Sequence, residues 1–142
     1  MKHKYLCELF PEDELPFPYG EPDYPDFDER DTFDMDCTLI AWIYEHLRYF
    51  QDEASKVVNL GWEGALFEID GENLTQHQCI DRMVEDCKTI LLKDKFTGKE
   101  YDEMFSDGKK LMLIYKKREK QADVAKDDLF KVLSKCFWAM WW

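Results

Sequence analysis

The residue types that could carry chemistry are few and widely spaced. The chain has three histidines and five cysteines, and His77-Gln78-Cys79 with Cys87 eight residues later is the closest approach to a metal-binding pattern. A structural zinc site needs four ligands, usually as two close pairs, and the second pair is missing. Cys79 and Cys87 also fall on the apolar face of a predicted helix, where free cysteine behaves as a small hydrophobe. The sequence therefore predicts no metal and no cofactor.

Carboxylates are too abundant, at 31 of 142 residues, for a pair of acids to indicate a site. Asp34 and Asp36 are better explained by helix capping than by calcium, because the Gly and distal Glu of a calcium loop do not follow. Gly61 and Gly64 lack the Lys-Ser/Thr of a phosphate loop, and no serine lies in a nucleophile turn. His46 is better explained as a helix-surface residue than as a general base. We therefore expect no catalytic residue and a non-enzymatic function.

The elements that would position any site are mainly helical. Apolar periodicity predicts a bundle of three to four helices with at most a short β-hairpin. The first helix is expected over 34–54, capped by Asp34. Its expected apolar face comprises Leu39, Ile40, Ile43, Leu47 and Phe50. A short strand over 66–69 runs into an Asp70-Gly71 turn, and Thr75 with Gln78 forms a capping box that opens a second helix ending near Leu92.

The C-terminal third carries a long apolar stripe at near-helical spacing over 109–141. Mean helices have about 11–12 residues, so we predict two helices that meet near 119–123. One long helix, or a buried strand over 111–115, are the alternatives. The polar connection over 93–108 is expected to hold one or two short helical turns.

Charge divides the chain unevenly. The chain has a net charge of −12. Residues 1–36 hold 12 acids and 3 bases, and residues 37–92 hold 10 acids and 4 bases, so both parts are acidic. Residues 93–142 hold 9 acids and 12 bases, so this part is basic. All five prolines lie in the first 25 residues, which favours extended or turn-like backbone there. We therefore divide the chain into an extended, acidic, Pro- and aromatic-rich arm over 1–33 and a helical domain over 34–142.

Two interpretations fit the arm. In the first, its aromatic residues cover the helical core while its carboxylates stay in water. In the second, it offers an acidic strip with aromatic anchors to a basic partner surface. The candidate protein-binding residues are Glu12, Asp13, Glu14, Glu21, Asp23, Asp26, Asp28 and Glu29.

The chain ends in an aromatic run. Trp138, Trp141 and Trp142 share one helical face. We favour docking of this last turn into the core, which would fix the chain end. The alternative is a hydrophobic patch for a partner or for self-association, and a homo-oligomer using this face is the minority interpretation.

The run Phe27-Asp28-Glu29-Arg30-Asp31-Thr32-Phe33-Asp34-Met35-Asp36, which continues into Cys37-Thr38-Leu39-Ile40-Ala41-Trp42, resembles a pattern in uncharacterised small proteins of bacteriophages and prophages of Gram-positive hosts. The stretches Thr75-Gln76, Cys79-Ile80-Asp81-Arg82-Met83 and the closing Ala139-Met140-Trp141-Trp142 are also similar. The likeness spans roughly 27–92 and 129–142. This chain departs from it with Phe33 in place of Trp and Met35 in place of Leu. The resemblance implies a phage origin and no particular activity.

Composition limits the remaining possibilities. Hydrophobic residues make up 45% and aromatic residues 15% of the chain, too much for a chain disordered throughout. Acidity argues against direct nucleic-acid binding. Five scattered cysteines, and the lack of an apolar signal or membrane segment, predict the reducing host-cell cytoplasm and no membrane contact.

We therefore expect a phage accessory protein that binds and modulates a bacterial host protein. A narrower hypothesis is an acidic anti-defence inhibitor of a nucleic-acid-binding protein, whose carboxylates imitate phosphates. The alternatives are a protein that binds a nucleotide-like small molecule and a virion structural or assembly component.

Overall fold

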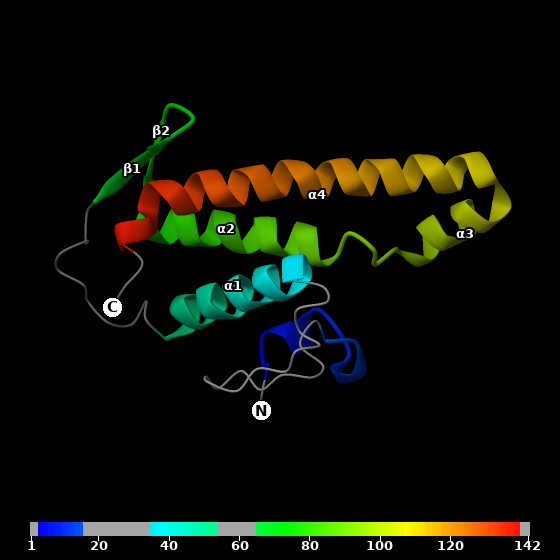
Figure 1. Ribbon diagram of the computed structural model, residues 1–142, viewed down its shortest axis with the longest axis horizontal. Helices are drawn as coiled ribbons and strands as arrows, with labels where there is room; N and C mark the ends of the chain where they lie inside the picture. Colours follow the sequence, from blue (N-terminus) through cyan, green and yellow to red (C-terminus); the bar gives the residue numbers. More distant parts are fainter. Residues whose placement is uncertain (1–2, 16–34, 54–64, 140–142) are drawn as a thin grey trace.

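A computed structural model of the chain describes residues 3–15, 35–53 and 65–139. These residues form a mainly helical bundle with one short hairpin (Figure 1), which confirms the predicted fold class. In chain order the elements are η1 (Leu6–Glu8), η2 (Glu12–Glu14), α1 (Met35–Asp52), β1 (Leu66–Ile69), β2 (Glu72–Thr75), α2 (Gln76–Leu91), α3 (Gly98–Ser106), α4 (Gly108–Cys136) and η5 (Phe137–Ala139).

Local sequence signals place the helix starts. The Thr75 hydroxyl accepts from the Gln78 amide at 3.2 Å, and the Gln78 side chain accepts from the Thr75 amide at 2.9 Å. This is the predicted capping box of α2. Thr97 and Glu100 form a second box at the start of α3, and the Asp107 carboxylate accepts from the Lys109 amide at the start of α4. The short helix expected within 93–108 is therefore confirmed.

The β-hairpin follows the predicted Asp-Gly turn. Strands β1 and β2 are antiparallel, and Ile69 pairs with Glu72. Asp70 and Gly71 between them both have positive φ, 54° and 81°. A two-residue turn of this kind matches the right-handed twist of the strands, and Asp-Gly is a preferred pair for it.

The core lies where α2 packs between α1 and α4 (Figure 1). Its largest fully buried side chains are Leu6, Tyr44, Ile69, Cys79, Ile80, Met83, Cys87, Leu129, Val132 and Cys136. Full burial of a large aliphatic side chain contributes about 1.5–3 kcal/mol. On α1, Ile40 and Leu47 are buried as predicted, whereas Leu39 is 47% exposed. The prediction that Leu39 lies on the core face is therefore wrong, because Leu39 lies on a solvent-exposed side of α1.

The prediction of two helices in the C-terminal third is wrong, and so is the strand alternative. Residues 108–136 form one helix of 29 residues, about 43 Å long at 1.5 Å per residue. Neither Gly nor Pro occurs between 109 and 136, so no residue there breaks the helix. The mean helix length was a poor guide because it ignores this absence of breakers.

The part of α4 that lies beyond α1 and α2 packs on α3 instead (Figure 1). Burial along α4 changes accordingly. Ala122, Ala125 and Leu129 are buried in the body, whereas Leu111 and Ile114 are only half-buried and Tyr115 is 38% exposed. Helices α3 and α4 thus form a helical hairpin that projects from the bundle.

The N-terminal segment belongs to the same core over 3–15. Tyr5, Leu6 and Leu15 are buried in the main cluster, and Phe10 packs against it. The acids of η2 stay exposed, as the first interpretation of the arm requires for these residues. Residues 16–34, with the predicted Asp34 cap and the boundary at 33/34, lie outside the described residues.

Candidate functional site

Helix α1 carries a second apolar face besides the one that it buries. Met35, Leu39, Trp42, His46 and Tyr49 follow one another at spacings of 4, 3, 4 and 3. We call these five residues the outer stripe. Met35, Leu39, Trp42 and Tyr49 are 64%, 47%, 53% and 49% exposed, and His46 is exposed as well. The spacing is the one with which coiled-coil helices present a seam to a partner helix.

A helix with apolar residues around most of its circumference is normally buried by other elements on most of its sides. On its core side, α1 buries Ile40, Ala41, Ile43, Tyr44, Leu47 and Phe50. The outer stripe extends this apolar surface to a side that faces solvent. The stripe therefore has the character of an interface and not of an ordinary solvent-facing helix side.

The centre of the stripe is held rigidly. The rings of Trp42 and His46 lie 3.9 Å apart between centroids at an interplanar angle of 30°. His46 Nδ1 donates to the Trp42 carbonyl oxygen at 2.7 Å. Since a carbonyl only accepts, Nδ1 carries the hydrogen and Nε2 is the other ring nitrogen available to a partner. A preformed aromatic pair loses little conformational freedom when a partner binds.

Acidic side chains flank the stripe along the side that faces the N-terminal segment. His3 contacts Glu45 at 3.1 Å, and Lys4 contacts Asp52 at 4.0 Å. Arg48 bridges Asp52 at 3.5 Å and Glu8 at 3.2 Å. These ion pairs fix residues 3–8 on α1.

Burial of Tyr5 beneath the N-terminal ion pairs, together with its hydrogen bond to Asp52, raises the pKa of its phenol to about 12. A depression of about 600 Å³ lies beside the stripe at this point, lined by His3, Lys4, Tyr5, Glu45, His46, Tyr49 and Glu53. The apolar surface of the stripe is therefore bordered by a depression into which a partner side chain can fit.

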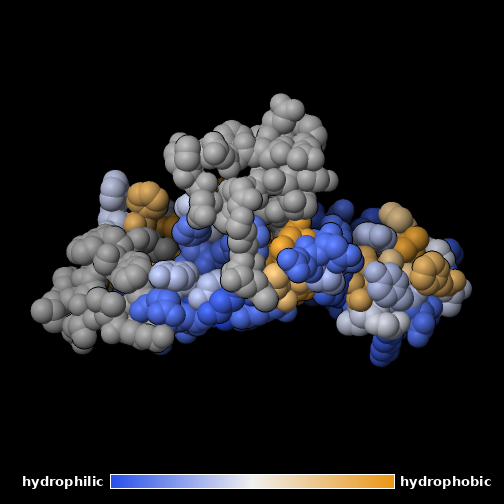
Figure 2. Space-filling model, turned by 90° about the horizontal axis from the view of Figure 1, so that it is seen from below, coloured by the Kyte–Doolittle hydropathy of each residue, from blue (hydrophilic) through white to orange (hydrophobic). Residues whose placement is uncertain are grey.

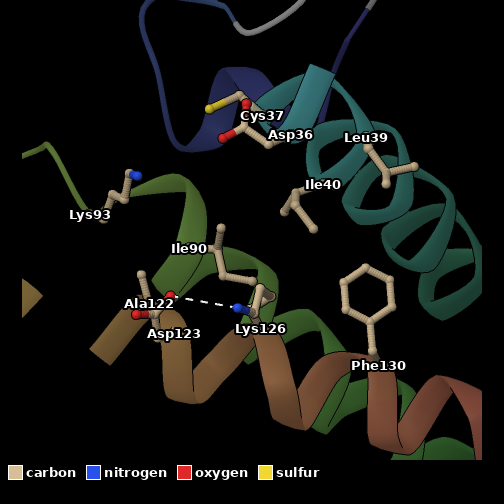
Figure 3. Close-up of a pocket in the computed structure, with 10 residues that line it drawn as sticks. All are labelled: Asp36, Cys37, Leu39, Ile40, Ile90, Lys93, Ala122, Asp123, Lys126 and Phe130. Carbon is tan, nitrogen blue, oxygen red and sulfur yellow. Dashed lines mark ion pairs between the residues drawn. The ribbon is translucent and has the colours of Figure 1, made fainter. Parts of the chain in front are cut away.

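On the opposite side of the stripe, a groove separates α1 from α4 (Figure 3). It has a volume of about 220 Å³. Ile40 and Ile90 point into it, and Phe130, 42% exposed, lies at one end (Figure 3). Its charged lining residues are Asp36, Lys93, Asp123 and Lys126. Leu39 belongs to both the groove and the stripe, so the two form one continuous surface.

A second cluster contains the most strongly perturbed carboxyl groups. The Asp86 Oδ2 atom is buried, and within the described part of the chain no nitrogen or hydroxyl donor reaches it. Burial, and then the neighbouring Asp128, raise the pKa of Asp86 to about 8. Arg82 binds Asp128 through two nitrogens and holds the pKa of Asp128 well below its usual range. The environment therefore favours the protonated form of Asp86, with the ionised Asp128 as its neighbour.

This cluster connects three elements. Arg82 on α2 also donates to Asp70 in the hairpin turn at 2.9 Å, and Lys131 on α4 donates to both Asp70 oxygens at 2.9 Å. The arrangement joins the hairpin, α2 and α4 through hydrogen bonds and opposite charges. These contacts therefore have a structural role, in which they hold the hairpin against α2 and α4.

The residues predicted from sequence are placed as follows. Glu12, Asp13 and Glu14 lie exposed in η2, whereas Glu21, Asp23, Asp26, Asp28 and Glu29 lie outside the described residues. Trp138 is 80% exposed, so this side chain does not fill the core. Its ring packs edge-on against Phe137 at 5.1 Å, and Trp141 and Trp142 lie outside the described residues.

Cysteine and histidine form no metal centre in the described ranges. Within 3–15, 35–53 and 65–139, no group of three or more His, Cys, Asp or Glu side chains is arranged to hold a metal ion. Cys79 and Cys87 are fully buried, and burial raises the pKa of the Cys87 thiol to about 12. None of the helices in the same ranges is both long enough and apolar enough to cross a bilayer.

Sequence reasoning missed the outer stripe, although its 4-3-4-3 spacing is legible in the sequence. No protein-family model, curated protein or solved structure matches this chain. These comparisons therefore assign no function, and the site is argued from its surface chemistry.

Proposed function

We propose that this chain is a non-enzymatic protein-binding protein whose outer stripe takes up an amphipathic helix with basic flanks from a partner protein. The observation that carries the proposal is the exposed heptad spacing of the stripe on α1. Apolar residues at these positions fit between the side chains of a facing helix. Trp42 and Tyr49 are residue types that dominate binding energy at interfaces.

Charge selects the partner's flanks. The acids beside the stripe are Asp36, Glu45, Asp52 and Glu53. Glu45 contacts His3, and Asp52 contacts Lys4 and Arg48. Among the described residues, these four acids outnumber the neighbouring Lys and Arg side chains by two. A partner with Lys or Arg along its apolar seam would meet complementary potential, which raises association rate and specificity. A partner with acidic flanks would meet repulsion.

The resemblance to small phage proteins extends this proposal to a bacterial host protein as the partner. If that partner's basic helix normally contacts nucleic acid, the acidic face of α1 would compete with phosphates for it. Binding should then weaken steeply with salt, since the screening length falls from about 30 Å at 0.01 M to about 8 Å at 0.15 M ionic strength.

A designed peptide tests the proposal directly. The probe is a helical peptide of about 20 residues, about 30 Å long, with Leu at the seam positions and Lys at the flanks. The control peptide has Glu at the same flanks. Isothermal titration calorimetry should detect the Lys peptide and not the Glu peptide, with affinity falling as salt rises. Equal binding of both peptides, or of neither, would contradict the proposal.

Two tryptophan variants locate the contact. Trp42→Ala should weaken binding of the Lys peptide by at least about 2 kcal/mol, roughly 30-fold, as expected for an aromatic anchor. Trp138→Ala is the matched control, because Trp138 is also exposed but lies beyond the end of α4. An equal loss in both variants would place the contact elsewhere. In lysate from a Gram-positive bacterium, a specific partner should be retained by the wild type and by Trp138→Ala and lost with Trp42→Ala.

The groove between α1 and α4 favours a second candidate, a small-molecule-binding protein. Its lining combines an apolar floor with two amines, Lys93 and Lys126, and two carboxylates, Asp36 and Asp123. Because Lys126 already pairs with Asp123 at 3.6 Å, the groove suits a mainly apolar molecule without net charge. Native mass spectrometry of protein purified from a bacterial host distinguishes the two candidates. A retained small ligand supports this second candidate, whereas a co-purifying protein supports the first.

A further inference from the structure

The outer side of the first half of α4 consists of lysines around a single leucine. Leu113 is 67% exposed, and the positions three, four and seven residues from it on the same helix are all lysine. Residues at these spacings are neighbours on one helix face. We call the following six exposed residues the lysine face: Lys109, Lys110, Leu113, Lys116, Lys117 and Lys120.

Contacts with α3 and the segment before it hold the lysine face toward solvent. On the other side of α4, Ile114 is half-buried, and Arg118 binds the Glu100 carboxylate of α3. Tyr115 packs edge-on against Phe96, with 5.2 Å between ring centroids. The lysine face is therefore a preformed part of the projecting hairpin.

The amines of the lysine face are not used for ion pairs among the described residues. Other lysines are paired, such as Lys88 with Glu85 at 3.2 Å and Lys126 with Asp123 at 3.6 Å. In the same described ranges, none of the five lysine-face amines takes part in an ion pair. Because the chain has 31 acids against 19 bases, five such amines on one face present a local positive charge to an anion outside the chain.

The acids of the hairpin lie mostly away from the lysine face. Asp107 caps α4, where its carboxylate accepts from the Lys109 amide at 2.9 Å. Asp102 and Glu103 belong to α3, and the hairpin end on the right of Figure 2 shows hydrophobic residues interleaved with hydrophilic ones. Glu103 lines a depression in which Lys117 is the one member of the lysine face. The opposite charge therefore reaches one edge of the face and not its centre.

We propose that the lysine face binds the phosphate backbone of double-stranded DNA without regard to base sequence. This inference goes beyond the proposed function, because it assigns a ligand to α4 and not to α1. Lysine is a compact point charge that suits phosphate contacts. Base recognition uses bidentate Arg, Asn or Gln side chains, and the face contains none of these residue types.

The arrangement of the lysines favours a duplex. At 3.6 residues per turn, Lys109, Lys116 and Lys120 form one row, and Lys110 and Lys117 form a second row on the other side of Leu113. A helix of about 10–12 Å diameter fits the major groove of B-DNA, which is about 12 Å wide. Each lysine row then lies toward the phosphates of one strand, and Leu113 lies toward the base edges.

Two other anionic partners fit the lysine face less well. Lysine is depleted at protein–protein interfaces, whose centres are apolar, and this face has one apolar side chain. A helix that lies in a lipid surface needs a continuous apolar face, whereas the neighbours of Leu113 on this side of α4 are lysines.

The net charge of −12 predicts no nucleic-acid contact, but charges act locally in salt. The screening length is about 8 Å at 0.15 M ionic strength. Leu113 lies about 14 Å along the helix axis from Ala122, which lines the groove beside α1. At physiological salt, the acids of the body therefore oppose the lysine face weakly.

Fluorescence anisotropy with the full chain tests the proposal. The probes are two labelled DNA duplexes of unrelated sequence, each of about 20 base pairs or about two helical turns. Both duplexes should bind equally. Five phosphate contacts give a slope of about −4.5 for log affinity against log salt, so affinity should fall about 500-fold between 50 and 200 mM salt.

Charge-neutral variants locate the contact. Lys116→Gln with Lys120→Gln removes two contacts and should reduce the slope to about −2.7. Lys126→Gln with Lys135→Gln is the matched control, because both lysines are exposed on α4 outside the lysine face. This control should keep the slope of wild type. Trp42→Ala should also bind DNA like wild type, so this test is independent of the peptide test on the outer stripe.

Several outcomes would overturn this inference. These are no binding to either duplex at 50 mM salt, an equal loss of slope in both double variants, and a preference for one base sequence. Binding of polyglutamate or of phosphatidylserine vesicles as strong as that of the duplex would assign the lysine face to an acidic protein or to a membrane instead. Circular dichroism checks that the variants fold, and Lys109→Gln with Lys116→Gln replaces the first double variant if it does not.

Discussion

The proton shared by Asp86 and Asp128 makes the stability of the fold depend on pH in a defined direction. In the folded chain the pKa of Asp86 is raised from 3.8 to about 8. In the unfolded chain an aspartate ionises near its ordinary pKa of about 3.9. Between about pH 4 and pH 8 the folded state therefore holds a proton that the unfolded state has released. The free energy of unfolding must fall as pH rises through this window.

Asp86→Asn is the perturbation that isolates this effect. The amide has the shape of a protonated carboxyl group, and its NH₂ donates to Asp128 without a titratable proton. A rise in pKa of this size corresponds to about 5–6 kcal/mol at 1.36 kcal/mol per pH unit. Asp86 is only half-buried, so solvent screening reduces the effect, and we expect about 1–2 kcal/mol.

Urea denaturation followed by circular dichroism at pH 5, 6.5 and 8 measures the difference. Asp86→Asn should gain about 1–2 kcal/mol relative to wild type between pH 5 and pH 8. Asp128 does not interfere in this window, because Arg82 lowers its pKa and it stays ionised above pH 5. Asp102→Asn, an exposed acid on α3, is the control and should follow wild type. A constant difference between Asp86→Asn and wild type across the three pH values would refute the shared proton.

Two further predictions concern the fold itself. Leu129 is fully buried, so Leu129→Ala should lower the free energy of unfolding by about 2–5 kcal/mol in urea titrations. Val124 lies on the same helix but is 62% exposed, so Val124→Ala should lower it far less. Equal losses in the two variants would contradict the assigned core. Thr75→Ala removes the capping box of α2 and should lower the free energy of unfolding by about 1 kcal/mol. Hydrogen exchange at the Gln78 amide should become faster, because this amide donates to the Thr75 hydroxyl. Unchanged exchange there would contradict the cap.

The elements that sequence predicted well are those decided by a few neighbouring residues. The cap at Thr75, the Asp70-Gly71 turn and the core face of α2 each depend on contacts within about one helical turn or one tight turn. Capping boxes and tight turns use characteristic residue types at fixed spacing, so the sequence alone predicts them. The fold class follows from it because each amphipathic helix must bury its apolar face against another.

Features decided over longer distances could not be read in the same way. The first half of α4 packs on α3 and Phe96, and this contact joins segments that periodicity alone does not place together. The proton between Asp86 and Asp128 depends on two helices that meet through tertiary packing. The outer stripe was legible as a pattern, but only the structure shows that α1 turns this side away from the core.

The length of α4 also decides how far the α3–α4 hairpin lies from α1. Ala122 and Asp123 of α4 line the groove beside Leu39 of α1, which fixes the position along α4 at which the body ends. Leu113 lies nine residues before Ala122, about 14 Å farther along the helix axis. Because neither Gly nor Pro occurs in this interval, α4 continues as one helix and holds its first half, with α3, away from α1.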